Sequence, residues 1–249
     1  MAEESWTPPS TFEEKLKRWL IPPKLELARI VARELDKGEP ELRLVEFLAD
    51  PRRAAIDVGA NRGIRAHVLA DICPKVYAFE PNPKLFPLLK AAAPRNVQCF
   101  AIGASDADGE ARLLVPGSGE HFSNQGATLN PAKVEGQLFE AVTVESKRLD
   151  ALPLDPVGFI KIDVEGHEQA VLAGARALIA RDKPVMIIEI EARHTKTPLF
   201  DALQAVKAMG YRLLVLTDAG LRDGDTLDTE HLPLSPRGAP VNNFIFLPL

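Results

Sequence analysis

From residue 54 onward, short apolar runs alternate with longer segments of helical periodicity. The runs are nearly continuous, as expected for strands that are covered on both faces. Strands that alternate with helices predict an α/β fold with a doubly wound, mostly parallel sheet. We expect seven strands, at residues 54–58, 76–79, 97–102, 159–164, 185–190, 211–217 and 244–247, with helices at 64–72, 83–93 and 199–209 and around Val171 to Leu178.

The N-terminal part of the chain has a different pattern. Residues 12–49 carry apolar residues at helical spacing, beginning with Phe12, Leu16, Trp19 and Leu20. A Pro-Pro pair at residues 22–23 separates two expected helices. We therefore divide the chain into an N-terminal helical segment, residues 1–50, and an α/β domain, residues 51–249. The segment is interpreted as a cap packed on the domain, and the alternative is a substrate lid or a dimer contact.

An insertion follows the third expected strand and breaks the alternation between about residues 105 and 156. Residues 110–115 and 142–144 are interpreted as strands, and the stretch between them, 116–138, is rich in Gly, Ser, Asn and Pro. So long a connection is typical of a functional loop or of disorder. Because it follows strand three, we expect residues 123–128 to belong to a mobile substrate loop near the cofactor.

The motif AIDVGANRG at residues 55–63 places a glycine-bearing turn directly after the first strand, and the second strand ends in Glu80. This is the layout of a nucleoside-binding βαβ unit, in which an acid can accept the ribose hydroxyls. The turn lacks the G-x-G-x-x-G pattern of a pyrophosphate site. It favours a nucleoside cofactor without pyrophosphate, and S-adenosylmethionine is the leading candidate. The alternative is a turn with a purely structural role.

Two further motifs place acids and histidines at the ends of strands. KIDVEGHE, residues 161–168, has Asp163 at the end of strand four, followed by Glu165, His167 and Glu168. Asp163 can meet a cationic amino group, and His167 can take up a proton near neutral pH. Alternatively, Glu165 and His167 cap the next helix, and Glu168 is a surface charge favoured by the helix dipole.

EIEARH, residues 189–194, ends strand five. Glu189 and Glu191 share one face of an extended chain. We expect that face to converge with Asp163 and His194 at the strand ends. Such a group can bind a divalent cation, for which Mg²⁺ or Ca²⁺ suits the oxygen ligands, or can form a hydrogen-bonded acid/base cluster. No ligand spacing decides between these, and the metal ligands stay unknown.

Composition and charge narrow the choice of partners. The formal net charge is −5 and the pI about 5.6, without a dense Lys/Arg run, so we do not expect nucleic acid as a partner. Two cysteines make no disulfide framework. No stretch has the length and apolarity of a membrane span, and the first residues do not resemble a signal peptide. We expect a cytoplasmic protein.

Together, these motifs resemble the FkbM family of S-adenosylmethionine-dependent methyltransferases. The resemblance covers about residues 54–248 and includes YAFEPNP, AIGASDADG and the terminal NNFIFLP. It implies a class I methyltransferase (Rossmann-like) fold for residues 51–249. It also implies methyl transfer to a hydroxyl of a sugar, glycolipid or secondary metabolite, so that the acceptor is a small molecule or a glycan.

The resemblance also implies roles for single residues. The turn would bracket the methionine part of the cofactor, the end of strand two would hold the ribose, and Asp163 would face the amino group or the reaction centre. The general base would be His194 or His167, with Glu165 and Glu189 in support. The cofactor-binding set is Asp57, Gly59, Ala60, Asn61, Gly63, Glu80, Pro81, Asn82, Ile102, Ser105, Asp106 and Asp163, of which Ile102, Ser105 and Asp106 would lie by the adenine.

Two other functions fit parts of the pattern. A non-catalytic module could have kept a nucleoside-cofactor site, because fold does not imply function. An NAD-dependent oxidoreductase would need the pyrophosphate turn that is missing here. The sequence is also compatible with a homo-oligomer.

Overall fold

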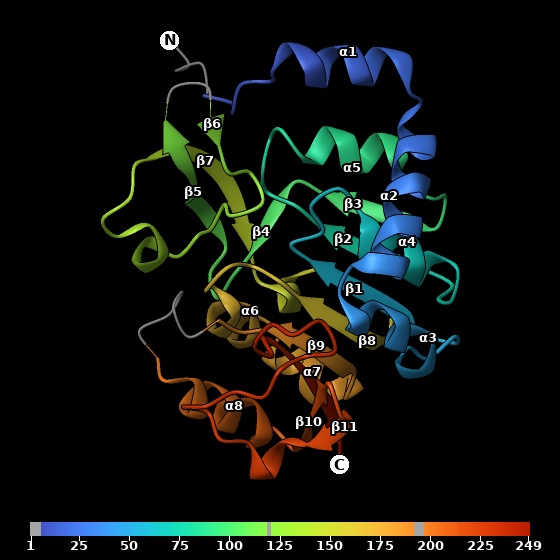
Figure 1. The fold of residues 1–249 in the computed structure, drawn as a ribbon, viewed down its shortest axis with the longest axis vertical. Helices are drawn as coiled ribbons and strands as arrows, with labels where there is room; N and C mark the ends of the chain where they lie inside the picture. The colour runs from blue at the N-terminus through green and yellow to red at the C-terminus, as the bar shows by residue number, and fades with distance from the viewer. Residues whose placement is uncertain (1–5, 119–120, 192–196) are drawn as a thin grey trace.

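A computed structural model describes residues 6–118, 121–191 and 197–249 of the chain, and Figure 1 shows its ribbon. Its centre is a large sheet. The strands of this sheet are β1 (Ala54–Val58), β2 (Val76–Phe79), β3 (Val97–Phe100), β8 (Val157–Ile162), β9 (Val185–Glu189), β10 (Tyr211–Thr217), β11 (Gly220–Asp223) and β12 (Asn243–Pro248).

The order of strands in the sheet is β11-β10-β12-β9-β8-β1-β2-β3. The five strands from β9 to β3 are parallel, and β12 runs antiparallel to both β9 and β10. The predicted doubly wound, mostly parallel sheet is confirmed, but the predicted number of seven strands is wrong. The eighth strand is β11, which pairs with β10 as an antiparallel hairpin.

Helices cover both faces of this sheet because its strands are apolar on both sides. One core packs α6 (Glu168–Gly174), α7 (Arg176–Asp182) and α8 (Leu199–Lys207) against residues such as Ile56 and Ile160. The other core packs α4 (Ile64–Ala70) and α5 (Phe86–Ala92) against Ala55 and Phe159. Neighbouring residues of one strand thus enter opposite cores, as the alternation of side chains in a strand requires.

The N-terminal segment consists of α1 (Phe12–Leu20), α2 (Pro23–Lys37), the 3₁₀ helix η1 (Pro40–Leu44) and α3 (Val45–Leu48). Thr11 begins α1 with a capping box, in which its hydroxyl accepts from the Glu14 amide and the Glu14 carboxylate accepts from the Thr11 amide. Buried Leu27 and Val31 of α2 pack near α4 and α5. Figure 1 shows α1 beside α5 at the outer edge of the molecule.

The insertion after β3 forms a second, smaller sheet of order β4-β7-β5-β6. Its strands are β4 (Ile102–Ala104), β5 (Gly109–Ser118), β6 (His121–Phe122) and β7 (Phe139–Lys147). The 3₁₀ helix η2 (Pro131–Val134) lies between β6 and β7, η3 (Leu149–Ala151) follows β7, and η5 (Gly224–Thr226) follows β11. Figure 1 shows this sheet beside the carboxyl ends of the parallel strands. The predicted insertion of strands and loop after strand three is therefore present.

Some element boundaries differ from the sequence-based expectation. The third strand was expected to run to residue 102, but β3 ends at Phe100, and Ile102 begins β4 in the small sheet. The helix expected from residue 83 begins only at Phe86, after a turn in which the Asn82 side chain accepts from the Lys84 amide. Within the described ranges, no helix combines the length and the apolar character that a membrane span needs.

Candidate functional site

A cavity of about 530 Å³ opens at the carboxyl ends of β1, β2, β8 and β9. This is the edge at which doubly wound sheets bind ligands. The N-terminal segment lines one side through residues such as Arg33 and Glu39, and the insertion lines another through residues such as Asn124 and Thr128. The sheet edge alone would be open, and these two additions make it concave.

The glycine turn after β1 forms part of the cavity lining. Gly59 has φ of +79°, and a Cβ there would lie 1.8 Å from the Asp163 carbonyl oxygen. Asn61 also has a left-handed backbone, with φ of +52°, and Gly63 precedes α4 with φ of +88°. No side chain fits at Gly59, because β8 ends directly against this turn.

Asp57 lies behind the turn and is not part of the cavity lining. It is 1% exposed, and its Oδ2 accepts from the Ala66 amide at 3.0 Å, which ties β1 to α4. Burial raises the pKa of this carboxyl to about 6, although the charge of Arg65 opposes the rise. The predicted cofactor residue therefore takes a supporting position under the glycine turn.

Glu80 faces the cavity from the end of β2 and is held by two backbone amides. Its Oε2 accepts from the Asn61 amide at 2.7 Å, and its Oε1 accepts from the Asn82 amide at 2.9 Å. Burial raises its pKa to about 7, although the two amides favour the ionised form. A carboxylate oxygen has a second lone pair, so both oxygens can still accept a hydroxyl.

The other predicted cofactor residues fall into two groups. Ala60, Pro81 and Ile102 line the cavity together with Gly59, Asn61 and Gly103. Asn82, Ser105 and Asp106 are not among the lining residues. Asn82 is fully buried and donates to Asn124 Oδ1 of the insertion at 3.2 Å. The Ser105 hydroxyl contacts His167 Nε2 at 2.8 Å and donates to Asp106 at 3.2 Å.

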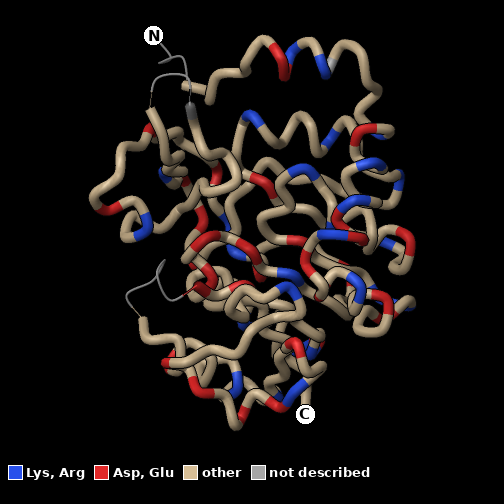
Figure 2. Tube along the Cα trace, in the orientation of Figure 1, with Lys and Arg blue, Asp and Glu red and all other residues tan. Residues whose placement is uncertain are grey.

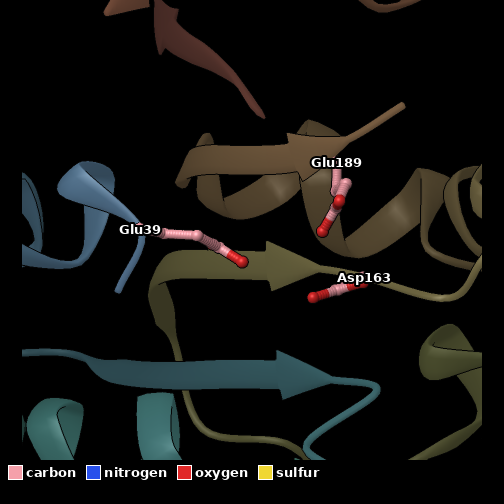
Figure 3. A group of neighbouring side chains, drawn as sticks. All are labelled: Glu39, Asp163 and Glu189. Carbon is pink, nitrogen blue, oxygen red and sulfur yellow. The ribbon is translucent and has the colours of Figure 1, made fainter. Parts of the chain in front are cut away.

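Three carboxylates, Glu39, Asp163 and Glu189, converge in the cavity lining, as Figure 3 shows. In the strand order, β8 and β9 lie on the other side of β1 from β2, at whose end Glu80 lies. The three carboxylates come from the chain before η1, from the end of β8 and from the end of β9. Each offers an oxygen within 4.8 Å of the others. Arg65 of α4 pairs with two of them, at 3.1 Å with Asp163 Oδ2 and through its other terminal nitrogen with Glu39.

The pKa values of Asp163 and Glu189 are shifted in opposite directions. Lys161 and Arg65 hold the pKa of Asp163 below its usual range against the effect of burial. Burial and the charge of Asp163 raise the pKa of Glu189 to about 8, and Asn242 donates to its Oε1 at 2.6 Å. One carboxyl of the pair is therefore ionised near neutral pH while the other keeps a proton. The expected convergence of Asp163 and Glu189 is present.

The divalent cation expected at the ends of strands four and five stays a prediction, and the structure brings Glu39 to Asp163 and Glu189 there. The oxygen ligands suit Mg²⁺. Arg65 already supplies a positive charge to Glu39 and Asp163, so the cluster is partly compensated by the protein itself.

The insertion is anchored on the KIDVEGHE motif. The Thr128 hydroxyl donates to the Glu165 carbonyl at 2.8 Å, and the Asn130 side chain donates to the Gly166 carbonyl at 2.8 Å. Lys133 forms an ion pair with the Glu165 carboxylate. Burial raises the pKa of Glu165, and Lys133 opposes that rise. The expected loop residues 123–128 thus contribute to the cavity wall, where Asn124, Gln125, Ala127 and Thr128 lie.

His167 lines the cavity next to Ser105 rather than next to Glu189's cluster of carboxylates. Burial lowers the pKa of its imidazole, which favours the neutral form. The alternative interpretation of Glu168 as a surface charge is wrong. Glu168 is 4% exposed, accepts from the Gly166 amide at 2.7 Å, and burial raises its pKa to about 7. His194 lies outside the described residues.

Sequence reasoning missed Glu39, Arg65 and Asn242 as members of this site. Glu39 belongs to a segment without a recognised motif, and its place becomes visible only from its ion pair with Arg65 of α4. Arg65 carried a usable signal, because a cation two residues after the glycine turn lies close to the predicted acidic strand ends. Asn242 precedes the last strand, β12. Because the order of strands along the chain does not show that β12 pairs with β9, the contact of Asn242 with Glu189 could not be predicted.

Comparison with known proteins identifies the family. The profile of the Methyltransferase FkbM domain matches residues 57–213. The chain belongs to the FkbM methyltransferase family. The match begins at Asp57 and includes Glu80, Asp163 and Glu189, whereas Glu39 lies before the matched residues.

Two relatives of this FkbM-family chain differ in what they show. The hexuronic acid methyltransferase AglP of Haloferax volcanii is 28% identical over 167 residues, which cover 64% of this chain and 65% of that protein. The crystal structure of methyltransferase FkbM from Methylobacillus flagellatus KT aligns with a TM-score of 0.50 at 20% identity. That alignment covers 79% of this chain and 44% of that one and supports the class I methyltransferase fold.

Proposed function

We propose that this protein transfers a methyl group from S-adenosylmethionine to a hydroxyl of a sugar, glycolipid or secondary metabolite. One observation carries the proposal. One cavity of about 530 Å³ is lined by Glu80 at the end of β2 and by the carboxyl pair of Asp163 and Glu189 at the ends of β8 and β9. A nucleoside cofactor needs the first feature, and activation of a hydroxyl needs a proton acceptor such as the second.

The described residues fit S-adenosylmethionine. Glu80 has free lone pairs for the two ribose hydroxyls, Asn61 and Gly59 bring backbone close to the methionine part, and Ile102 offers an apolar surface to the adenine. Asp163, held ionised, would meet the cationic amino group. When bound, this cofactor supplies a methyl group on a positively charged sulfur. The residues then have to orient the acceptor oxygen and remove its proton.

Glu189 is our candidate for the proton acceptor among the described residues. His167 already contacts Ser105, Glu165 pairs with Lys133, and Asp163 pairs with Arg65. In its ionised form, Glu189 would take the hydroxyl proton as the oxygen forms its bond to the methyl carbon and the carbon–sulfur bond breaks. A pKa raised to about 8 makes Glu189 a stronger base than an ordinary carboxylate. His194 remains the alternative base.

The acceptor class is supported by one relative, which is described as a hexuronic acid methyltransferase. From that relative we infer a sugar or glycan as the acceptor. We also propose that residues 51–249 form the methyltransferase domain and that residues 1–50 complete its cavity. A cytoplasmic location, a homo-oligomer and a requirement for Mg²⁺ stay predictions. A cofactor-binding module without turnover is the competing function.

Calorimetric titration with S-adenosylmethionine tests the cofactor site. Glu80→Gln removes the charge and places an NH₂ group against a backbone amide. Since hydrogen bonds to a charged group contribute about 1.5–3 kcal/mol, we expect about 10- to 100-fold weaker binding. Glu46→Gln, an exposed change on α3, should bind as the unmodified protein does. A folded protein without affinity for S-adenosylmethionine would refute the proposal.

Transfer of a labelled methyl group to uronic acid glycosides and neutral hexosides then tests turnover, in EDTA and in Mg²⁺. We expect an ether on a hydroxyl and, for Glu189→Gln, a loss of about 100-fold or more in kcat, in line with general base catalysis. Cofactor binding with no product from any acceptor would favour the binding module. Activity that survives EDTA would remove the magnesium prediction.

A further inference from the structure

The apolar side of helix α1 faces outward. Its apolar residues lie along one stripe at helical spacing, and they are exposed by 81% at Phe12, 43% at Leu16, 81% at Trp19 and 60% at Leu20. A helix of a globular domain normally buries such a stripe. Here the structure leaves it in solvent along the full length of the helix.

The polar side of α1 faces the rest of the protein. Glu14 pairs with Lys84 at 3.0 Å, and Lys17 pairs with Glu26 of α2 at 3.2 Å. Lys84 is nearly buried by this arrangement, with 8% of its side chain exposed. Two ion pairs to different partners fix the rotation of the helix about its axis, so the outward direction of the stripe is built into the fold.

The two helices α1 and α2 together carry more basic than acidic residues. Residues 12–37 contain seven Lys and Arg against five Asp and Glu, whereas the whole chain has a net charge of −5. Glu14 pairs with Lys84 outside this segment, and Glu26 and Glu34 pair with Lys17 and Arg33 within it, so these pairs leave the segment with an excess of basic residues. Lys15 follows Phe12 by three residues and precedes Trp19 by four, so it borders the stripe directly. Figure 2 shows Lys and Arg along both helices.

We propose that α1 docks this protein on an anionic lipid surface. An interfacial helix places Trp, Phe and Leu among the headgroups and acyl chains while basic residues meet anionic lipids. The remainder of the chain has a net negative charge and is repelled as a whole by the same surface, which favours approach through the basic N-terminal segment. This inference does not rest on the proposed methyl transfer.

Docking through α1 also fixes where the site lies relative to the lipid. The inner side of α1 lines a second cavity of about 340 Å³, through Glu14 and Lys17. That cavity shares Asn61, Arg62 and Asn124 with the main one. A docked protein therefore holds the second cavity, which adjoins the main one, beneath the helix that contacts the membrane surface.

Vesicle binding by the full chain tests the proposal. The chain has two tryptophans, so Trp6→Phe leaves Trp19 as the single fluorophore. With vesicles of equal parts phosphatidylglycerol and phosphatidylcholine, we expect a blue shift of Trp19 emission and cosedimentation, both reduced by high salt. The double variant Phe12→Ser with Trp19→Ser should bind at least tenfold more weakly. Lys15→Glu should weaken binding to these vesicles severalfold.

Phe47→Ser is the matched control, because Phe47 on α3 is 79% exposed, as Trp19 is 81% exposed, but lies outside the stripe. It should bind vesicles as the unmodified chain does. Equal loss in this variant would overturn the role of α1, and so would the absence of vesicle binding. A dimer in analytical ultracentrifugation that Trp19→Ser dissociates, without vesicle binding, would assign the stripe to a second copy instead. Each of these readouts is independent of methyl transfer.

Discussion

The two acidic sides of the cavity are built in different ways. Glu80 is held by the backbone amides of Asn61 and Asn82, which lie in the two turns that follow β1 and β2. Glu39, Asp163 and Glu189 come from three distant parts of the chain. Their charge is balanced by the side chain of Arg65, which comes from a fourth.

The two sides therefore differ in how well they tolerate side-chain substitutions. Backbone donors are present whatever the side chains are, so the Glu80 side depends mainly on the path of the chain. The other side depends on charged side chains, and loss of the Arg65 guanidinium leaves partly buried carboxylates with the charge of Lys161 as their main remaining compensation. The first side is suited to a cofactor that is always the same. The second can be changed by substitutions in several elements, as an acceptor site would require.

Among these predictions, Arg65→Met is expected to have the largest effect on stability. It leaves Glu39 and Asp163 unpaired in a partly buried cluster and should lower the free energy of unfolding by about 3 kcal/mol. Arg33→Met is the control, because Arg33 pairs with Glu34 at 2.9 Å on the surface and should cost less than about 1 kcal/mol. Urea unfolding measures both. Equal losses in the two variants would show that the cluster does not depend on Arg65.

Glu189→Gln should change how stability depends on pH. Above its ordinary pKa of 4.5 an unfolded Glu189 releases its proton, whereas the folded protein keeps it up to about pH 8. The unfolded state therefore binds fewer protons, and stability falls as pH rises through this window, by up to about 1.4 kcal/mol per pH unit for one proton. Glutamine mimics the protonated form and should flatten the curve.

Unfolding in urea at a series of pH values gives this slope, with Glu46→Gln as the control. An unchanged slope in Glu189→Gln would place the retained proton on another buried carboxyl, of which Glu80 and Glu168 have a pKa raised to about 7.

Thr128→Val is expected to have the smallest effect. Thr128 is 1% exposed, and its hydroxyl donates to the Glu165 carbonyl and accepts from the Asn130 amide. Losing these bonds should cost about 1 kcal/mol and speed amide exchange in the insertion. Thr143→Val, on the exposed side of β7, should change neither quantity. Hydrogen exchange and thermal unfolding measure both quantities. Equal results for the two variants would show that the Thr128 hydroxyl does not anchor the insertion.

The parts of the fold that were predicted correctly are those with a local signal. Each of the strands β1, β2, β8 and β9 is an apolar run that ends in or is followed at once by a turn or an acid of the site. β11 escaped prediction because Gly220–Asp223 has no apolar run, and its pairing with β10 is what makes it a strand. The count of seven strands failed at this hairpin for that reason.

The site follows the same rule. Glu80 could be placed from its motif, since its partners are the amides of neighbouring turns. Glu39 could not, because nothing within residues 1–50 indicates that η1 brings it to Arg65. The burial of Glu168 was missed because reasoning from the helix dipole treats each helix as exposed, whereas here β4 and η3 pack against α6.

The anchoring of the insertion on residues 165 and 166 has a consequence for the exchange of parts between relatives. Thr128, Asn130 and Lys133 attach the insertion, part of which lines the cavity, to the same short segment that follows Asp163. A grafted insertion that lacks these three side chains would lose its attachment, however well its own strands pair. Acceptor preference and the KIDVEGHE motif would then have to be transplanted together, as one module made of two stretches of chain.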